Sequence, residues 1–151
     1  MSTILNVSPK GIDFICSFEG FRAQPYQDSG GVWTVGFGQT LDSQGVAKYA
    51  KGITEQQAKV LLAFHLDNEC IQLRQLALGG LNQTQIDAIV SLTYNIGFEA
   101  FSKSTVYNQI MTRAINLESW ELFIKDQHGN TQEGLVTRRR KELQLFIYGQ
   151  Y

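Results

Sequence analysis

The sequence predicts a mostly helical α+β fold with two lobes: a small N-terminal lobe with a β-sheet, a long connecting helix and a helical C-terminal lobe. Turn residues and a short alternating run fall within residues 21–40, whereas helical periodicity and capping signals recur from residue 54 onward. The predicted boundaries are 8–53, 54–78 and 79–151. With 151 residues, 43% of them apolar, the chain is long enough to bury a core.

A first helix is predicted to begin at Pro9, because Ser8 is a favourable N-cap and proline suits the first helical position. Apolar residues then recur at helical spacing and bring Glu19 onto the same face, in the last turn before Gly20. Burial and the nearby helix C-terminus both disfavour the charged form of such a carboxyl. This environment is typical of a general acid.

A small antiparallel sheet is predicted next, with Asp28 in a turn and an alternating strand over 32–38. The bulky members of this strand are expected to be buried: Trp33, Val35 and Phe37. The opposite face carries Thr34 and two glycines, Gly36 and Gly38. A face with so little side-chain volume leaves room for a ligand against the backbone.

A polar loop is predicted over 41–53. A long helix then begins with a capping box formed by Thr54 and Gln57, and Gly79 with Gly80 ends it. A second capping signal, Asn82 with Gln85, starts a buried helix that Gly97 ends. Shorter helices are predicted over 105–111, 117–125 and 135–148, with a surface loop over 126–134.

Glu19, Asp28 and Thr34 together supply what glycoside hydrolysis requires: an acid, a base or nucleophile, and a hydroxyl that holds a water. Each has an ordinary structural interpretation when taken alone. Glu19 is then an ion-paired residue at a helix end, Asp28 bonds its own turn, and Thr34 is a strand former. The joint spacing beside a glycine-rich face favours catalysis.

The spacing resembles that of the phage-type lysozymes, or endolysins. Their pattern is a Glu-Gly, an aspartate in a Tyr-x-Asp turn and a threonine in Thr-x-Gly-x-Gly. The matching segments here are Glu19-Gly20, Tyr26-Gln27-Asp28 and Thr34-Val35-Gly36-Phe37-Gly38. The likeness continues through 85–97 and 134–146, so it covers essentially the whole chain.

This resemblance implies hydrolysis of the β-1,4 bond between N-acetylmuramic acid and N-acetylglucosamine in bacterial peptidoglycan, without a cofactor. Glu19 is then the general acid that protonates the leaving oxygen. Asp28 supports the oxocarbenium-like transition state as base or nucleophile, and Thr34 orients the attacking water with it.

The resemblance also implies roles outside this triad. Substrate-binding roles fall to Gly38, Asn95 and Phe101. Arg138 is expected to pair with the catalytic Glu19, and the rest of the basic run 138–141 is expected to be exposed. A helix-capping role for Asn95 competes with substrate binding. Gln39 stands where the family often has a histidine.

The remaining polar residues predict no further chemistry. The net charge of −1 argues against a nucleic-acid partner. Cys16 and Cys70 are expected to be reduced thiols, and no metal is assigned to His65, a predicted core or boundary residue, or to His128. Trp33 and Trp120 are expected to be core anchors.

Neither a signal peptide nor a membrane-spanning segment is apparent in the sequence. The expected location is therefore the host cytoplasm until lysis, and then the periplasm and cell wall. A monomer that depends on a separate holin for release is expected, with peptidoglycan as its partner.

Two alternatives remain open from the sequence. A lytic transglycosylase would form 1,6-anhydro products with one catalytic glutamate, and the presence of Asp28 and Thr34 disfavours it. A non-catalytic peptidoglycan-binding module would have no need for the three polar residues.

Overall fold

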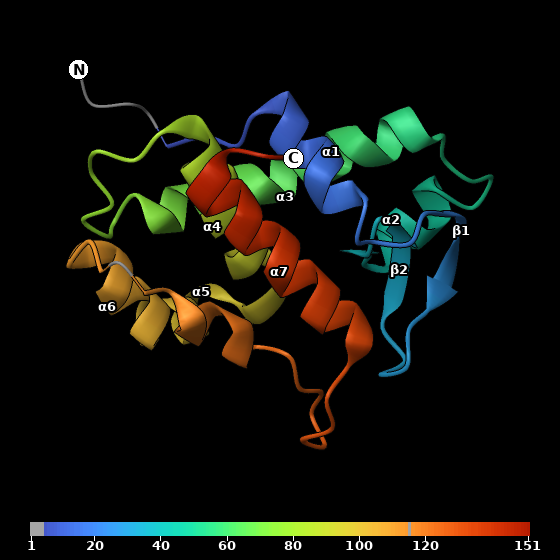
Figure 1. Cartoon of the computed structure of the whole chain (residues 1–151). Helices are drawn as coiled ribbons and strands as arrows, with labels where there is room; N and C mark the ends of the chain where they lie inside the picture. The colour runs from blue at the N-terminus through green and yellow to red at the C-terminus, as the bar shows by residue number, and fades with distance from the viewer. Residues whose placement is uncertain (1–4, 115) are drawn as a thin grey trace. The chain divides into compact units, whose positions relative to one another are not determined.

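The computed structural model describes residues 5–114 and 116–151. Two compact units divide the chain: one contains residues 12–65, and the other contains the described residues up to 11 together with 66–151. The three-stranded sheet lies in the first unit, and the second is helical (Figure 1). The predicted mostly helical α+β fold is confirmed.

Helix α1, Pro9–Cys16, begins where the sequence predicts. The Ser8 hydroxyl accepts a hydrogen bond from the Gly11 N–H at 3.0 Å, which caps the first turn. The helix ends before Glu19, however. The N–H groups of Phe18 and Glu19 bond three residues back, so Glu19 lies in a tighter turn that follows the helix.

The sheet of the 12–65 unit has three antiparallel strands, β1 (Arg22–Gln27), β2 (Trp33–Gly36) and β3 (Gln39–Thr40), in that order. The prediction that Trp33 is buried is wrong, because it is 41% exposed. Trp33 opens its strand beside the hairpin turn, where neighbouring strands cover it poorly. Thr34, expected on an open face, is only 5% exposed because β2 is the central strand.

The predicted loop over 41–53 contains a helix, α2, Ser43–Lys48. The Asp42 carboxylate accepts a hydrogen bond from the Gly45 N–H at 2.7 Å and so starts the helix. This helix is not apparent from the sequence pattern, because glycine and polar residues outnumber apolar ones in the segment.

Helix α3, Glu55–Leu73, starts with the predicted capping box: the Gln57 N–H donates to Thr54 Oγ1 at 3.1 Å, and Gln57 Oε1 accepts from the Thr54 N–H at 2.8 Å. It ends at Leu73, before the predicted stop at Gly79. Its fully buried residues recur at helical spacing: Ala58, Leu62, Leu66, Cys70 and Leu73. His65 falls outside this stripe and is exposed, contrary to prediction.

The 66–151 unit is built around α4, Gln83–Ile96, and α7, Glu133–Tyr148, which lie side by side (Figure 1). The predicted Asn82–Gln85 capping box is present, and Gly97 ends α4 with a φ of +88°. Trp120 is fully buried, as predicted, and its ring lies 5.3 Å from that of Phe146.

Short helices connect α4 to α7. They are α5 (Phe98–Ser102), α6 (Thr105–Met111) and the 3₁₀ helix η1 (Glu118–Leu122). The sequence predicted α6 at these bounds, did not predict α5, and placed a longer helix where η1 lies. Both cysteines are free, as predicted.

Candidate active site

Glu19 is half-buried in the turn after α1, and the next residues attach this turn to the sheet. The ring of Phe21 packs against that of Phe37, with 5.4 Å between centroids. Phe37 is 4% exposed and follows β2 directly. The aromatic contact therefore fixes the backbone beside Glu19 to the sheet that carries Thr34.

Asp28 is exposed in the β1–β2 hairpin, and one of its oxygens organises the turn. Asp28 Oδ1 accepts hydrogen bonds from the N–H groups of Gly30 at 2.8 Å and Val32 at 2.9 Å. Among the residues that the structure describes, no hydrogen bond reaches Oδ2. The carboxylate thus has one oxygen committed to the turn and one available to a water or a sugar.

Thr34 is held by its own strand. Its hydroxyl donates to the Val32 carbonyl at 3.0 Å, so its lone pairs remain available as acceptors. In the sheet register Thr34 stands opposite Tyr26 on β1 and Thr40 on β3. Directly opposed residues of antiparallel strands share a face.

Asp28 follows Tyr26 by two residues and its N–H still donates to the Val32 carbonyl at 2.9 Å, so the strand pairing extends to it. Side chains two apart along a strand point to the same face. The hairpin therefore directs Asp28 and Thr34 to one face of the sheet. Two acceptor groups on one face are suited to holding a water that donates both protons.

Gly36 and Gly38 differ in why the structure accommodates glycine at their positions. A Cβ on Gly36 would lie 2.9 Å from the Ala58 Cβ and 3.0 Å from Gln39 Oε1, so Gly36 is required by packing. Gly38 has a φ of +91° and nothing within 4 Å of an added Cβ. Its backbone has open space beside it, and substrate binding at Gly38 stays a prediction.

Gln39, at the position where the family often has histidine, is 3% exposed. Its Oε1 accepts from the Phe37 N–H at 2.9 Å, and its Nε2 donates to the Phe37 carbonyl at 3.2 Å. The amide thereby closes the β2–β3 turn with a donor and an acceptor in one side chain.

In the 66–151 unit, Arg138 is buried on α7. Its Nε donates to Glu142 Oε1 at 3.0 Å, and its Nη2 donates to the Ser91 carbonyl at 3.1 Å. Arg139, predicted to be exposed, is also buried, because its Nη1 donates to Glu142 Oε2 at 2.8 Å. Burial lowers the pKa of Arg139 to about 10.

The buried carboxylate of Glu142 was missed by the sequence analysis. Besides the two arginines, it accepts from Ser91 Oγ at 2.7 Å and from Trp120 Nε1 at 3.1 Å. One signal was available: Glu142 follows Arg138 by four residues and Arg139 by three, the spacing at which helical side chains meet.

The other predicted binding residues lie in the same unit. Asn95 is exposed near the end of α4, and its Oδ1 accepts a hydrogen bond from Arg139 Nη2. Phe101 is fully buried on α5, with its ring 5.8 Å from that of Tyr107. Phe101 therefore cannot contact a substrate directly, and it can influence a binding surface only by supporting the residues that cover it.

Within the described ranges 5–114 and 116–151, no group of three His, Cys, Asp or Glu side chains has the arrangement of a metal site. No helix of those residues combines the length and apolar character needed to cross a membrane.

A family model described as phage lysozyme matches residues 16–142, which include the whole triad region. The chain belongs to the phage lysozyme family. It is 33% identical over 146 residues to the endolysin of Salmonella phage P22, covering 95% of this chain and 99% of that relative.

Solved structures of phage lysozymes and related domains agree with this assignment. The endolysin from Escherichia coli O157:H7 phage FAHEc1 is 29% identical, with a TM-score of 0.86 over 100% of this chain and 99% of that one. The muramidase domain of SpmX from Asticaccaulis excentricus is 31% identical, with a TM-score of 0.82 over 94% and 97%. The predicted family, the lysozyme fold and the glycoside hydrolase class are confirmed.

Proposed function

We propose that this phage lysozyme hydrolyses the β-1,4 bond between N-acetylmuramic acid and N-acetylglucosamine, with Glu19, Asp28 and Thr34 as its catalytic residues. The observation that carries the proposal is the hairpin face that Asp28 and Thr34 share, with acceptor groups available on both side chains. Family membership supports a peptidoglycan substrate.

In this mechanism Glu19 donates its proton to the glycosidic oxygen while the C1–O bond breaks. Asp28 stabilises the positive charge that develops at C1. A water that donates to Asp28 Oδ2 and to Thr34 Oγ1 presents its own lone pair to C1. Asp28 takes the proton as the new C–O bond forms, and proton transfer through solvent then restores Glu19.

Asp28 acts alternatively as the nucleophile, forming a glycosyl–enzyme intermediate. The two routes differ in stereochemistry, since attack by water inverts the anomeric centre and the covalent route retains it. Proton NMR of the first-formed reducing end separates them. The shared acceptor face of Asp28 and Thr34 favours the water route.

Glu19→Gln tests the catalytic assignment. It removes the donated proton with little change in shape, so the rate of cell-wall clearing should fall by about 10²–10⁴-fold. Glu99→Gln is the matched control, because Glu99 is an exposed glutamate in a surface ion pair with Lys103 and such pairs contribute little. Unchanged clearing by Glu19→Gln would reject both the assignment of Glu19 and the glutamate-dependent transglycosylase alternative. A non-catalytic binding module would show no clearing by the wild type either.

The products distinguish hydrolysis from transglycosylation. Hydrolysis adds water to each cleaved bond, whereas a 1,6-anhydro product is lighter by one water. Mass spectrometry of muropeptides released by the wild type should therefore show reducing ends.

Substrate binding by Gly38, Asn95 and Phe101, and assistance to Glu19 from Arg138, also remain proposals. Because Asn95 is exposed and its Oδ1 already accepts from Arg139, its N–H₂ group supports a donor role toward a saccharide. Asn95→Ala should raise KM more than it lowers kcat if that role holds.

Two further properties are proposed because the chain belongs to the phage lysozyme family. The protein is a monomer, and it reaches the cell wall with the help of a separate holin. Sedimentation of the purified protein checks the oligomeric state, and lysis timing with and without a co-expressed holin checks the release route.

A further inference from the structure

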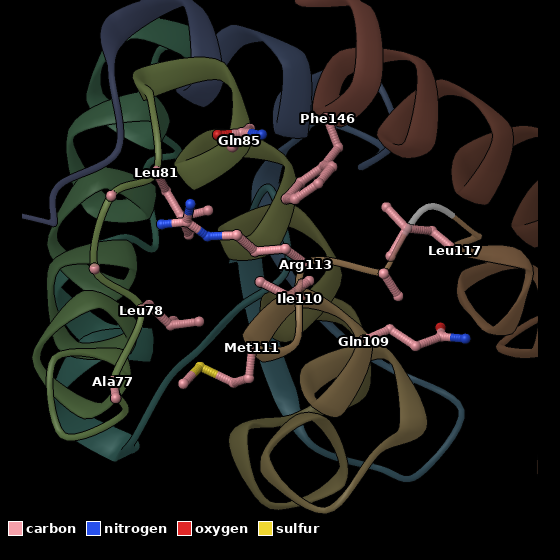
Figure 2. Close-up of a pocket in the computed structure, with 13 residues that line it drawn as sticks. Ala77, Leu78, Leu81, Gln85, Gln109, Ile110, Met111, Arg113, Leu117 and Phe146 are labelled. Atoms are coloured by element: carbon pink, nitrogen blue, oxygen red, sulfur yellow. The ribbon is translucent and has the colours of Figure 1, made fainter.

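A cavity in the 66–151 unit lies between the segment after α3, the end of α6 and the C-terminal part of α7 (Figure 2). Its volume is about 550 Å³, within the range of small-molecule sites. None of the residues proposed for catalysis lines it. The cavity therefore needs a separate explanation.

The lining of this cavity combines apolar side chains with polar groups in similar proportion. Aliphatic, thioether and aromatic side chains face it: Leu78, Leu81, Ile110, Met111, Leu117 and Phe146 (Figure 2). Gly79 and Gly80 contribute no side chains on one side. A hydrocarbon chain matches these apolar side chains.

The polar side chains at the cavity are donors. Gln85 Oε1 accepts from the Asn82 N–H at 3.0 Å, and Gln109 Oε1 accepts from Ser119 Oγ, so both carbonyl oxygens are already used. Their N–H₂ groups remain. No acidic side chain occurs among the described residues that line the cavity.

Arg113 adds a positive charge. Its side chain extends from the end of α6 toward Leu81 (Figure 2), and its Nη2 lies 3.5 Å from where a Cβ on Gly80 would be. Over residues 5–114 and 116–151 the structure gives this guanidinium no ion pair or hydrogen bond. Arg113 is exposed, and a cation at the edge of a cavity with apolar side chains on its walls complements an anion with an apolar tail.

The backbone at Arg113 is unfavourable for arginine. Its φ of +52° makes it the one left-handed non-glycine residue in the described chain. Its N–H donates to the Ile110 carbonyl at 3.1 Å and the Ala114 N–H to the Gln109 carbonyl at 2.9 Å, a helix ending that usually takes glycine at this position. Helix termination therefore does not explain the arginine.

We propose that this cavity binds an amphipathic anion made of one alkyl chain with an oxyanion head. The chain occupies the apolar walls, and the head accepts hydrogen bonds from Arg113 and Gln85. Free fatty acids and single-chain phospholipids share this chemistry, with a carboxylate or a phosphate head.

The test titrates sodium dodecanoate, below its micelle concentration, into protein labelled with ¹³C at the methionine methyl groups. Met111 lines the cavity and Met1 is the only other methionine in the sequence, so two signals are expected. The Met111 signal should shift in a saturable way while that of Met1 does not. A Met111 signal that stays in place would overturn the proposal.

Arg113→Gly is the decisive variant, because glycine suits the left-handed position and folding is not at risk. Its affinity for dodecanoate should fall by about tenfold or more, since hydrogen bonds to charged groups are lost. Arg140→Ala, an exposed arginine of α7, is the control and should bind as the wild type does. Unchanged affinity in Arg113→Gly would reject the role of the guanidinium.

Three further ligands distinguish the contributions of the head group and of the alkyl chain to binding. Dodecyl phosphate tests the phosphate head, dodecanol tests the chain without charge, and acetate tests the head without the chain. Binding of either dodecyl anion, with dodecanol and acetate much weaker, supports the proposal. Equal binding of dodecanol or acetate contradicts it.

Discussion

Asp28 and Thr34 each use part of their hydrogen-bonding capacity on the backbone and keep part of it available. Asp28 Oδ1 stabilises the hairpin turn, and the Thr34 proton goes to the Val32 carbonyl. Both side chains are thereby held in one orientation by the strands that carry them. In the proposed mechanism, this pre-organisation means that neither group would have to reorient when substrate arrives.

Substitutions at Thr34 test the role of its hydroxyl. Thr34→Ser keeps the oxygen, Thr34→Ala removes it, and Thr34→Val replaces it with a methyl group of similar volume. Activity should be retained best by serine and should fall by about 10²-fold in the other two if the water loses its second acceptor. Equal steady-state rates in all three variants would exclude Thr34 from the mechanism.

Glu69 on α3 predicts a pH effect that is separate from catalysis. Burial raises its pKa, and Oε2 has no hydrogen-bond partner among the described residues. A raised pKa means that the ionised carboxyl destabilises the folded state as pH rises through the folded pKa. Below the unfolded pKa, about 4.3, the carboxyl is neutral in both states and this penalty is absent.

Glu69→Gln should therefore raise Tm at pH 7 and leave it nearly unchanged near pH 4. An increase of about 1–2 °C is expected, since 1 kcal/mol shifts Tm by about 2–4 °C at this size and partial exposure reduces the effect. Calorimetry at both pH values measures it. A lower Tm at pH 7 would mean that Glu69 makes a favourable interaction.

At the scale of elements, the pairing of α4 with α7 depends on one buried carboxylate. Glu142 accepts from Arg138 and Arg139 on its own helix, from Ser91 on α4 and from Trp120 on η1. Removing its charge takes one anionic partner away from two buried guanidinium groups. Such a loss is costly because the cations stay desolvated.

Glu142→Gln is accordingly expected to lower the free energy of unfolding by about 3 kcal/mol. Urea denaturation followed by circular dichroism measures the change. Glu121→Gln, an exposed glutamate of η1, provides the comparison and should stay close to wild type. A similarly small change in both variants would contradict the structural role of Glu142.

Local signals predicted the starts of elements better than their ends or their surroundings. The caps at Ser8, Thr54 and Asn82 were recognisable because the donor and acceptor lie within four residues of each other. The end of α3 at Leu73 was not, since no glycine or proline marks it.

Whether a charged side chain is buried or an apolar one exposed depends on residues far away in the sequence, so local patterns did not predict it. Arg139 was predicted to be exposed because a basic run is usually solvated. Its partner Glu142 also accepts hydrogen bonds from Ser91 and Trp120, which are far away in the sequence. Trp33 was predicted to be buried from strand alternation, which carries no information about where the sheet ends. The prediction of Glu19, Asp28 and Thr34 as catalytic residues used no such information, because these residues lie close together along the chain, and it stays a prediction.

At the scale of the molecule, each unit contains one thiol in an environment that suppresses its reactivity. Cys16 lies in the 12–65 unit and Cys70 in the other, and burial raises the pKa of each to about 11. At pH 8 the fraction of reactive thiolate is then about 100-fold lower than for an ordinary cysteine.

Both cysteines should consequently be alkylated by iodoacetamide at least about tenfold more slowly in the native protein than in urea-unfolded chains. Peptide mass spectrometry after timed quenching gives a rate for each site. A fast native rate at one cysteine would show that its unit opens locally under these conditions.

The two tryptophans are likewise divided between the units, with Trp33 41% exposed on β2 and Trp120 fully buried beneath α7. Indole emission shifts to longer wavelength in water, so the native spectrum combines a red component from Trp33 with a blue one from Trp120. Because Trp33 directly precedes Thr34, a saccharide that reaches the hairpin should change the red component selectively. If the proposed site is right, the emission of Trp33 would report substrate engagement, and that of Trp120 would serve as the internal reference.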